Sequence, residues 1–398
     1  MSLSQLTQDV KAAARAIGFD RVGISDAAPL AGAEAAIQRR IADGHMDGLK
    51  WFTPERARLA TRPQELLPGA QSIIALAASY LGQREAPPMV PGKPRGRVAR
   101  YAWGRDYHDV LKELARELVE RVESIAGRPV RARVFVDSSP LAERAVAQRA
   151  GLGWFGKNTM LLLPGAGSWA FLCEVILDLP LEPDRPVRKS CGACQRCLDV
   201  CPTGALLSPG VLDNSRCISF LTIELKERVP RDLRPLMGSW IFGCDDCQEV
   251  CPVNRHALPA SIAALRAYDD EAAYPQLLPL LEMDDAQFRI RYRGTPLMRA
   301  KSWGLQRNAC IALGNLRDEA AVPALAAVLL SSERHPLVRE HAAWALGQME
   351  TPKARVALDL AWSRLSSEDA GLAEELVLTL GGQLPGSVPF GSASGAGA

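Results

Sequence analysis

The apolar residues in the first 180 positions alternate between helical and extended spacing. They recur every three or four positions from Ser4 to Ile17 and from Val110 to Val122, which predicts two amphipathic helices. A nearly continuous apolar run from Ser72 to Tyr80 predicts a strand buried on both faces. Shorter segments predict further strands at 21–25, 130–136 and 169–179 and a helix at 143–150. We therefore expect an α/β domain over residues 1–180.

Beyond about residue 275 the pattern becomes helical only and repeats itself. Residues 308–315 read Asn-Ala-Cys-Ile-Ala-Leu-Gly-Asn, and residues 341–348, 33 positions later, read His-Ala-Ala-Trp-Ala-Leu-Gly-Gln. A second helical segment, Ala321 to Leu330, lies between them. Paired helices at this period are typical of HEAT-like solenoids. We expect all-α HEAT-like repeats over 276–380, and a disordered tail rich in Gly, Ser and Ala over 381–398.

Composition narrows the class of protein. The 398 residues include 47 basic and 45 acidic ones, so the chain has no global signature of nucleic-acid binding. No apolar run reaches the ~18 residues of a membrane span, and no signal peptide is recognisable. Clustered cysteines without such a signal imply a reducing compartment. We expect a cytoplasmic protein that acts as a monomer and has no membrane partner.

The strongest chemical signal is a group of cysteines. Eight of the ten lie within 61 residues: seven form two runs that each end in Cys-Pro, and one lies between the runs. In two-cluster ferredoxins, cysteines three apart hold one cubane cluster, and the cysteine before the proline binds the other. The second run lacks one close-spaced cysteine, and the lone cysteine between the runs is the obvious replacement. The ligands are therefore predicted to be Cys191, Cys194, Cys197 and Cys251 for one [4Fe-4S] cluster, and Cys201, Cys217, Cys244 and Cys247 for the other, in a ferredoxin-like module over 181–275.

Zinc and disulfides are the alternative uses of these cysteines. Structural zinc sites take two separated pairs of ligands rather than runs of three plus one that end in Cys-Pro. Disulfides are rare in a reducing compartment. The two remaining cysteines, Cys173 and Cys310, lie in apolar segments, so we expect them to be core residues.

A candidate site lies in the first domain. Asp137 follows the strand predicted at 130–136, at the edge where open α/β sheets bind ligands. Residues 151–158 read Gly-Leu-Gly-Trp-Phe-Gly-Lys-Asn, and their three glycines would let the backbone approach a large ligand closely. An ordinary turn between a helix and a strand is the simpler interpretation. The segment is not a P-loop, because asparagine follows Gly-Lys where serine or threonine belongs.

Two basic runs are candidates for a phosphate-binding surface, although either could be a solvated face. Basic residues neutralise backbone phosphates, and aromatic residues stack on bases. The first run lies at 93–105, with Tyr101 and Trp103 interleaved. The second lies at the entry to the helical repeats and comprises Arg289, Arg291, Arg293, Arg299, Lys301 and Arg307.

The order of these motifs closely resembles that of the epoxyqueuosine reductase family. The matching pieces are Asp106-Tyr-His, Val136-Asp137-Ser, Arg144-x4-Arg-Ala-Gly-x-Gly-Trp-x-Gly-Lys157-Asn158, both cysteine runs, Cys217-Ile-Ser-Phe-Leu-Thr-Ile-Glu-Leu-Lys226 and the final helical repeats. Many ferredoxins share the cysteine runs, whereas their combination with the segments at 137 and 217 is much more specific. The resemblance covers nearly the whole chain apart from the tail.

This resemblance implies a cobalamin cofactor and the last step of queuosine synthesis. In that step the epoxide on the modified wobble base of a tRNA is reduced with two electrons and two protons, and water is released. The resemblance places the proton donor at Asp137 and the cobalamin-facing side chains at Arg144, Lys157 and Asn158. Desolvation beside an apolar corrin would raise the pKa of Asp137 and keep it protonated. The electron donor to the clusters is not identified by the sequence, and tRNA is expected at Arg293, Arg299, Lys301 and Arg307.

The segment around His108 is similar to a motif, Asp-x-His-x-x-Gly, whose histidine binds cobalt in some cobalamin proteins. In this chain Leu111 stands where the glycine belongs. We therefore expect no protein ligand to cobalt, as the family resemblance also implies, and a capping role for His108.

Two other functions compete with this interpretation. A corrinoid reductase of the reductive dehalogenase kind would also join a cobalamin domain to two clusters, but its small substrate would need neither helical repeats nor basic runs. A ferredoxin carrier on a helical scaffold would not be an enzyme, and it would have no use for a carboxylate at the end of a strand in a separate α/β domain.

Overall fold

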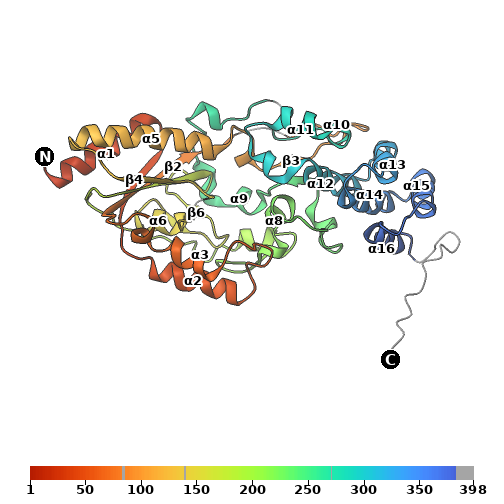
Figure 1. Ribbon diagram of the computed structural model, residues 1–398, viewed down its shortest axis with the longest axis horizontal. Helices are drawn as coiled ribbons and strands as arrows, with labels where there is room; N and C mark the ends of the chain where they lie inside the picture. The colour runs from red at the N-terminus through yellow and green to blue at the C-terminus, as the bar shows by residue number, and fades with distance from the viewer. Residues whose placement is uncertain (83–85, 139, 270, 382–398) are drawn as a thin grey trace.

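The computed structural model describes residues 1–82, 86–138, 140–269 and 271–381. In Figure 1 a sheet with its helices lies at one end of the molecule and the helical repeats lie at the other, with the loop-rich cysteine module between them. The tail predicted to be disordered lies, except for Gly381, outside the described residues. Within the described part of the chain, no helix is both long and apolar enough to cross a membrane.

The first domain is built on a four-stranded sheet with the order β1-β2-β7-β4. The strands are β1 (Arg21–Asp26), β2 (Ser72–Ser79), β7 (Ala170–Leu177) and β4 (Ala132–Phe135). Each neighbouring pair is antiparallel. The sequence predicted the positions of these strands correctly. The argument that ligands bind at the carboxyl edge of the strands holds for open, mostly parallel sheets, so it does not apply to this antiparallel sheet. Asp137 must therefore owe its place to local contacts.

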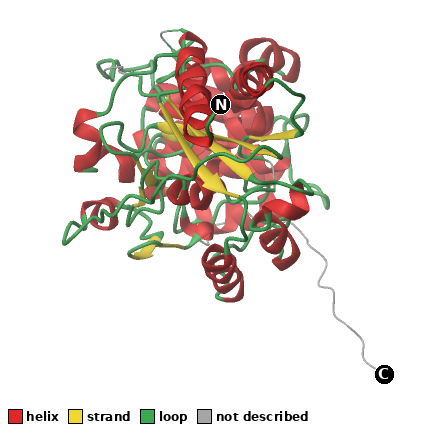
Figure 2. Ribbon diagram, turned by 90° about the vertical axis from the view of Figure 1, so that its left-hand side faces the viewer, coloured by secondary structure: helices red, strands yellow, loops and turns green. Residues whose placement is uncertain are grey.

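Helices cover both faces of this sheet, which explains why β2 is buried along its whole length. Helices α1 (Leu3–Ile17) and α5 (Tyr107–Ala126) pack on one face, where alternate β2 residues such as Leu76 join their core. Helix α6 (Glu143–Arg149) packs on the other. In Figure 2 helices surround the yellow strands. Further helices of this domain are α2 (Ala31–Ala42), α3 (Pro54–Ala60) and α4 (Pro63–Leu66).

The cysteine module has little regular structure. Its helices are α7 (Arg196–Val200), α8 (Ile218–Ile223) and α9 (Asp246–Glu249), and three strand pairs lie in or beside it. The pairs are β3 (Arg97–Val98) with β10 (Trp240–Phe242), β5 (Trp154–Phe155) with β6 (Leu161–Leu162), and β8 (Leu206–Ser208) with β9 (Val211–Leu212). Short 3₁₀ turns occur at Arg100–Ala102, Asn214–Arg216, Pro235–Met237, Pro252–His256, Ala263–Leu265, Pro296–Ala300 and Glu319–Ala321.

The helical repeats share one hydrophobic core with the module. This core joins residues of β3 and β10, including Ile241, to Leu305 and Leu313 in the repeats. A domain boundary at 275–276 stays a prediction, but the two parts cannot be treated as independent bodies. The helices of this region are α10 (Leu277–Glu282), α11 (Asp285–Tyr292), α12 (Lys301–Leu316), α13 (Val322–Leu330), α14 (Pro336–Met349), α15 (Pro352–Ser363) and α16 (Ala370–Thr379).

Candidate active site

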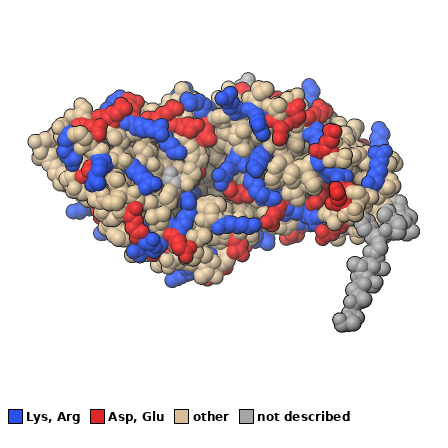
Figure 3. All heavy atoms as spheres, viewed as in Figure 1, with Lys and Arg blue, Asp and Glu red and all other residues tan. Residues whose placement is uncertain are grey.

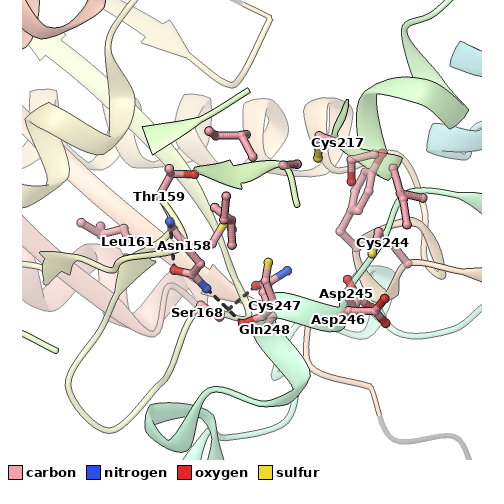
Figure 4. A pocket seen from close by; sticks show the side chains of 18 of the residues that line it. Asn158, Thr159, Leu161, Ser168, Cys217, Cys244, Asp245, Asp246, Cys247 and Gln248 are labelled. Carbon is pink, nitrogen blue, oxygen red and sulfur yellow. Dashed lines mark hydrogen bonds between the residues drawn. The ribbon is translucent and has the colours of Figure 1, made fainter. Parts of the chain in front are cut away.

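A cavity lies between the sheet domain and the cysteine module. Its volume is about 1610 Å³ when the solvent-filled mouth is included. Apolar side chains such as Leu161 and Phe171 form part of its wall, and Asp137 lines it from the sheet domain. Figure 4 shows three cysteines of the module, Cys217, Cys244 and Cys247, beside the same cavity. One space thus adjoins both a candidate proton donor and candidate cluster ligands.

The start of helix α5 organises the surroundings of Asp137. Asp106 caps this helix by accepting a hydrogen bond from the His108 backbone N–H at 3.0 Å. Its carboxylate also contacts the His108 ring at Nδ1, 2.8 Å away, which turns Nε2 toward the Asp137 carboxylate at 3.4 Å. The Tyr107 hydroxyl donates a hydrogen bond to the same carboxylate. The expectation that His108 caps the helix is wrong, because Asp106 is the cap; His108 instead contacts Asp137, which the sequence did not predict.

These contacts determine where a proton is held. Desolvation at the wall of the cavity raises the pKa of Asp137, although its side chain is 60% exposed, but hydrogen bonds from His108 and Tyr107 and the charges of His108 and Arg144 hold it below its usual range. Burial lowers the pKa of His108, but hydrogen bonds to Asp106 and Asp137 outweigh this effect and raise it to about 9. The protein's own side chains thus favour the carboxylate form of Asp137, and the expected effect of a corrin on its pKa stays a prediction. His108 carries the proton, and loses it as the pH rises through about 9.

Of the three residues predicted to face the cofactor, two line the cavity. Arg144 and Asn158 line the cavity, whereas Lys157 is not among the described residues that do. Arg144 donates a hydrogen bond to the Thr159 carbonyl at 3.1 Å. Asn158 is buried, and its amide donates to the Cys247 carbonyl at 3.3 Å, as Figure 4 shows. Asn158 therefore joins the sheet domain to the module, and its side chain is not free in the cavity.

The glycines at 151–156 serve the packing of the protein itself. A Cβ atom on Gly153 would lie 2.2 Å from the Leu162 carbonyl oxygen, and one on Gly156 would lie 2.5 Å from the side chain of Asn158. Gly151 has a φ of +76°, which side chains rarely tolerate. The segment is thus a close-packed turn into β5, and the simpler interpretation of its glycines is the better one.

The first group of cysteines gathers beside α7. Burial is the main cause that raises the pKa of Cys197, and the charges of Cys191 and Cys251 raise it further. Burial and then the charges of Cys191 and Cys194 likewise raise the pKa of Cys251. Such mutual effects require proximity, and they link Cys251 across the sequence to the first run. They bring Cys251 near the first run, and the ligand set of the first cluster stays a prediction.

The second group lies deeper and lines the cavity. Cys217 directly precedes helix α8. Burial is the main cause that raises its pKa, and the charge of Cys201 raises it further. Burial raises the pKa of Cys244 and of Cys247, and the charge of Cys217 raises both further. These effects connect the four predicted ligands of the second cluster, whose assignment stays a prediction. Cys173 and Cys310 are fully buried, as expected of core residues.

The basic run at 93–105 mostly forms internal ion pairs. Arg97 pairs with Glu249 at 3.2 Å, and Arg100 pairs with Asp245 at 3.3 Å. Trp103 is 3% exposed, so it cannot stack on a base. The structure therefore gives most of this run a structural role.

The run at the entry to the repeats contains both surface and interior residues. Arg293, Arg299 and Lys301 are exposed, and Arg299 forms an ion pair with Glu224 at 2.8 Å. Figure 3 shows basic side chains between the two ends of the molecule, with acidic ones interspersed. The expectation that Arg307 binds tRNA is wrong, because its side chain is fully buried. Its guanidinium donates to the carbonyls of Leu221, Leu225 and Glu227 at 2.6–2.8 Å.

Arg307→Met should destabilise the protein without a specific effect on tRNA. Each of the three carbonyls left unpaired costs about 1–3 kcal/mol, a large part of the ~5–15 kcal/mol that stabilises a typical protein. Urea denaturation should show a free energy of unfolding lower by about 3 kcal/mol or more. Lys301→Met, which alters an exposed residue of the same helix, should stay within about 0.5 kcal/mol of the wild type. Equal stability of the two variants would contradict the structural role of Arg307.

Comparisons with known proteins agree with this architecture. The profile described as "Epoxyqueuosine reductase QueG, DUF1730" matches residues 61–138. A 4Fe-4S double cluster binding domain matches residues 190–254, and HEAT repeats match residues 295–381. The module and the helical repeats are thereby confirmed as classes of domain.

Curated relatives and solved structures cover most of the chain. The epoxyqueuosine reductase of Xanthomonas campestris is 42% identical, over 85% of this chain and 95% of the relative. That of Escherichia coli is 38% identical, over 87% and 90%. A crystal structure of an epoxyqueuosine reductase with an epoxyqueuosine-modified tRNA-Tyr stem loop has a TM-score of 0.88 at 34% identity, over 96% of this chain and all of that one.

The iron–sulfur module, the adjoining cavity lined by Asp137 and the array of HEAT repeats define an iron–sulfur oxidoreductase with a helical-repeat domain. The relatives identify it further. The chain belongs to the epoxyqueuosine reductase family.

Proposed function

We propose that this protein reduces epoxyqueuosine to queuosine at the wobble position of tRNA. The observation that carries the proposal is the shared cavity, which brings Asp137 and the predicted ligands of the second cluster together in a member of this family. Removal of the epoxide oxygen as water takes two electrons and two protons. The cysteine module would supply the electrons one at a time, and the group around Asp137 would supply a proton.

The cavity also fits the cobalamin that the family resemblance implies. It is large, partly apolar, and placed between the second group of cysteines and Asp137. Cobalamin would supply a low-valent metal centre able to reduce the epoxide. Arg144 and Asn158 would border it, Arg144 from α6 and Asn158 from the turn after β5. Nothing in the sequence or in the geometry around His108 requires a protein ligand to cobalt, because both ring nitrogens face carboxylates.

The chain's own residues would deliver the proton. His108 is protonated near neutral pH and shares its Nε2 hydrogen with the Asp137 carboxylate. An oxygen that becomes negatively charged in the cavity could take this proton through Asp137, because the two groups are already in contact. Asp106 fixes the orientation of the imidazole from the opposite side.

A direct assay tests the function. Protein purified without oxygen and reconstituted with iron, sulfide and cobalamin is mixed with tRNA that carries epoxyqueuosine and with a strong one-electron reductant. Nucleoside analysis should show queuosine. Reduction of a small halogenated compound without conversion of the tRNA would favour the dehalogenase alternative, and cluster reduction alone would favour the carrier.

The tRNA surface is proposed at Arg293, Arg299 and Lys301. The side chains are exposed. The hydrogen bond to Glu224 raises the pKa of Arg299, burial lowers it, and the charges of Glu224 and then of Asp137 raise it further, so Arg299 lies close to Asp137. A surface beside the cavity could hold the anticodon loop while the wobble base enters.

Arg293→Ala combined with Lys301→Ala should weaken tRNA binding and flatten its dependence on salt. Each lost phosphate contact reduces the slope of log affinity against log salt by about 0.7–0.9. Fluorescence anisotropy with a labelled anticodon stem loop at several salt concentrations measures that slope. Lys353→Ala combined with Arg364→Ala removes the same charge from exposed positions in and just after α15 and should leave the slope unchanged. Equal slopes in the two double variants would exclude the proposed surface.

A further inference from the structure

We propose that Glu143 is a positioning residue, which holds the backbone of Asp137 in a left-handed conformation and so directs the Asp137 carboxylate toward His108 and the cavity. This inference rests on the proposed function, since Asp137 matters only if it takes part in the reaction. It concerns a residue that the sequence did not single out and that lines the cavity beside Asp137.

The conformation of Asp137 needs external support. Its φ is +46°, a region that residues other than glycine rarely adopt. Aspartate tolerates this region better than most residues, yet such a conformation is strained and persists only where surrounding contacts impose it. Asp137 follows the end of β4 and is exposed, so packing of its own side chain does not impose it.

Glu143 supplies the missing contact from a rigid element. The backbone N–H of Asp137 donates a hydrogen bond to Oε1 of Glu143, while the Asp137 side chain is held by Tyr107 and His108. Asp137 is thereby fixed at both its backbone and its carboxylate. Glu143 is the first residue of α6, whose Val146 and Ala147 are fully buried against the sheet. The carboxyl group therefore has a fixed base from which to hold the loop.

The surroundings of Glu143 favour an uncharged carboxyl group. Burial, followed by the charge of Asp137, raises the pKa of Glu143 to about 8, although the Asp137 N–H, Arg144 and His108 act in the opposite direction. Glu174 of β7 is fully buried, neither of its carboxyl oxygens has a hydrogen-bond partner among the described residues, and burial followed by Glu143 raises its pKa. A neutral Glu143 can accept the N–H bond through its carbonyl oxygen without placing a second negative charge beside Asp137.

This arrangement makes glutamine a suitable substitute and alanine an unsuitable one. Glutamine has nearly the shape of a protonated glutamic acid and keeps the carbonyl oxygen that accepts from the Asp137 N–H. Alanine removes the acceptor and leaves α6 otherwise unchanged. If Glu143 acted instead by giving up its own proton, glutamine would fail as completely as alanine.

The test compares Glu143→Ala and Glu143→Gln with the wild type by two measurements. Single turnover of epoxyqueuosine tRNA, without oxygen and with excess reductant, should fall at least tenfold in the alanine variant and stay within about threefold in the glutamine variant. NMR titration of the His108 ring reports the position of Asp137 independently of activity. The pKa of His108 should fall in the alanine variant, because the Asp137 carboxylate is no longer held against it, and should be retained in the glutamine variant.

The outcomes separate this inference from the proposed function. Failure of the wild-type protein to convert the tRNA would overturn the function, while the NMR comparison would still decide whether Glu143 positions Asp137. An active wild type with an equally active alanine variant and an unchanged His108 titration would overturn the inference alone. Loss of turnover in both variants would also overturn it, because the carboxyl proton would then be required. Thermal unfolding of both variants identifies any loss of turnover that arises from misfolding.

Discussion

Asp137→Asn should lower the rate of epoxide reduction by about 10²- to 10⁴-fold, the usual cost of removing a general acid. Asparagine has the same shape and can still accept the hydrogen bond from Tyr107. It cannot relay a proton, and it removes the negative charge that helps His108 to stay protonated. The variant should therefore bind cofactor and tRNA yet fail in the chemical step.

Single-turnover kinetics with saturating tRNA isolate that step from binding. Asp109→Asn is the matched control, because Asp109 is an exposed carboxylate in the first turn of the same helix, α5. Its rate should equal that of the wild type. A near-normal rate in Asp137→Asn, measured with excess reductant, would remove Asp137 from the mechanism.

The secondary structure was predictable because each element follows the periodicity of its own residues. The apolar run at 72–80 became β2, and the near copies at 308–315 and 341–348 became the matching helices α12 and α14. The direction of neighbouring strands was not predictable in this way. Burial on both faces produces the same sequence pattern in an antiparallel sheet covered by helices as in a parallel one.

The use of the cysteines as iron–sulfur ligands was predictable because their spacing along the chain is typical of such ligands. The group around Asp137 was only partly predictable. His108 could be located at the start of a helix, but its contact with Asp137 joins residues 29 positions apart that meet only in the fold. Glu143 had even less signal, since a glutamate at the start of a helix is common for electrostatic reasons alone.

Arg307 shows where a charge pattern misleads. It continues a run of arginines and lysines, yet it lies on the inner side of α12 and binds backbone carbonyls of α8 and of the segment after it. Burial, followed by the charge of Arg234, lowers the pKa of Arg307 to about 10, which still leaves it charged near neutral pH. A count of basic residues cannot distinguish such a residue from Lys301, six positions earlier and exposed to solvent.

Cys217→Ala should remove about half of the iron and abolish activity. Two [4Fe-4S] clusters hold about eight iron atoms per chain, and the second would keep only three of its four predicted ligands. Cys217 lines the cavity with the other three cysteines of that group, whereas the first group lies away from it. Loss of the second cluster would therefore interrupt electron transfer at the step nearest the substrate, while the first cluster remains.

Iron and sulfide analysis, with electron paramagnetic resonance of the reduced protein, distinguishes loss of one cluster from loss of both. Cys310→Ala is the matched control. Cys310 is equally a free thiol, but it is fully buried in α12 with its sulfur 3.8 Å from the Val338 carbonyl, so all of the iron should remain. Full iron content in Cys217→Ala would mean that another group completes the second cluster. Loss of all the iron would mean that the clusters assemble only together. The position of Cys247, a predicted ligand of the second cluster, would allow this. Burial raises its pKa, and the charges that raise it further include those of Cys201 and of Cys197, a predicted ligand of the first cluster.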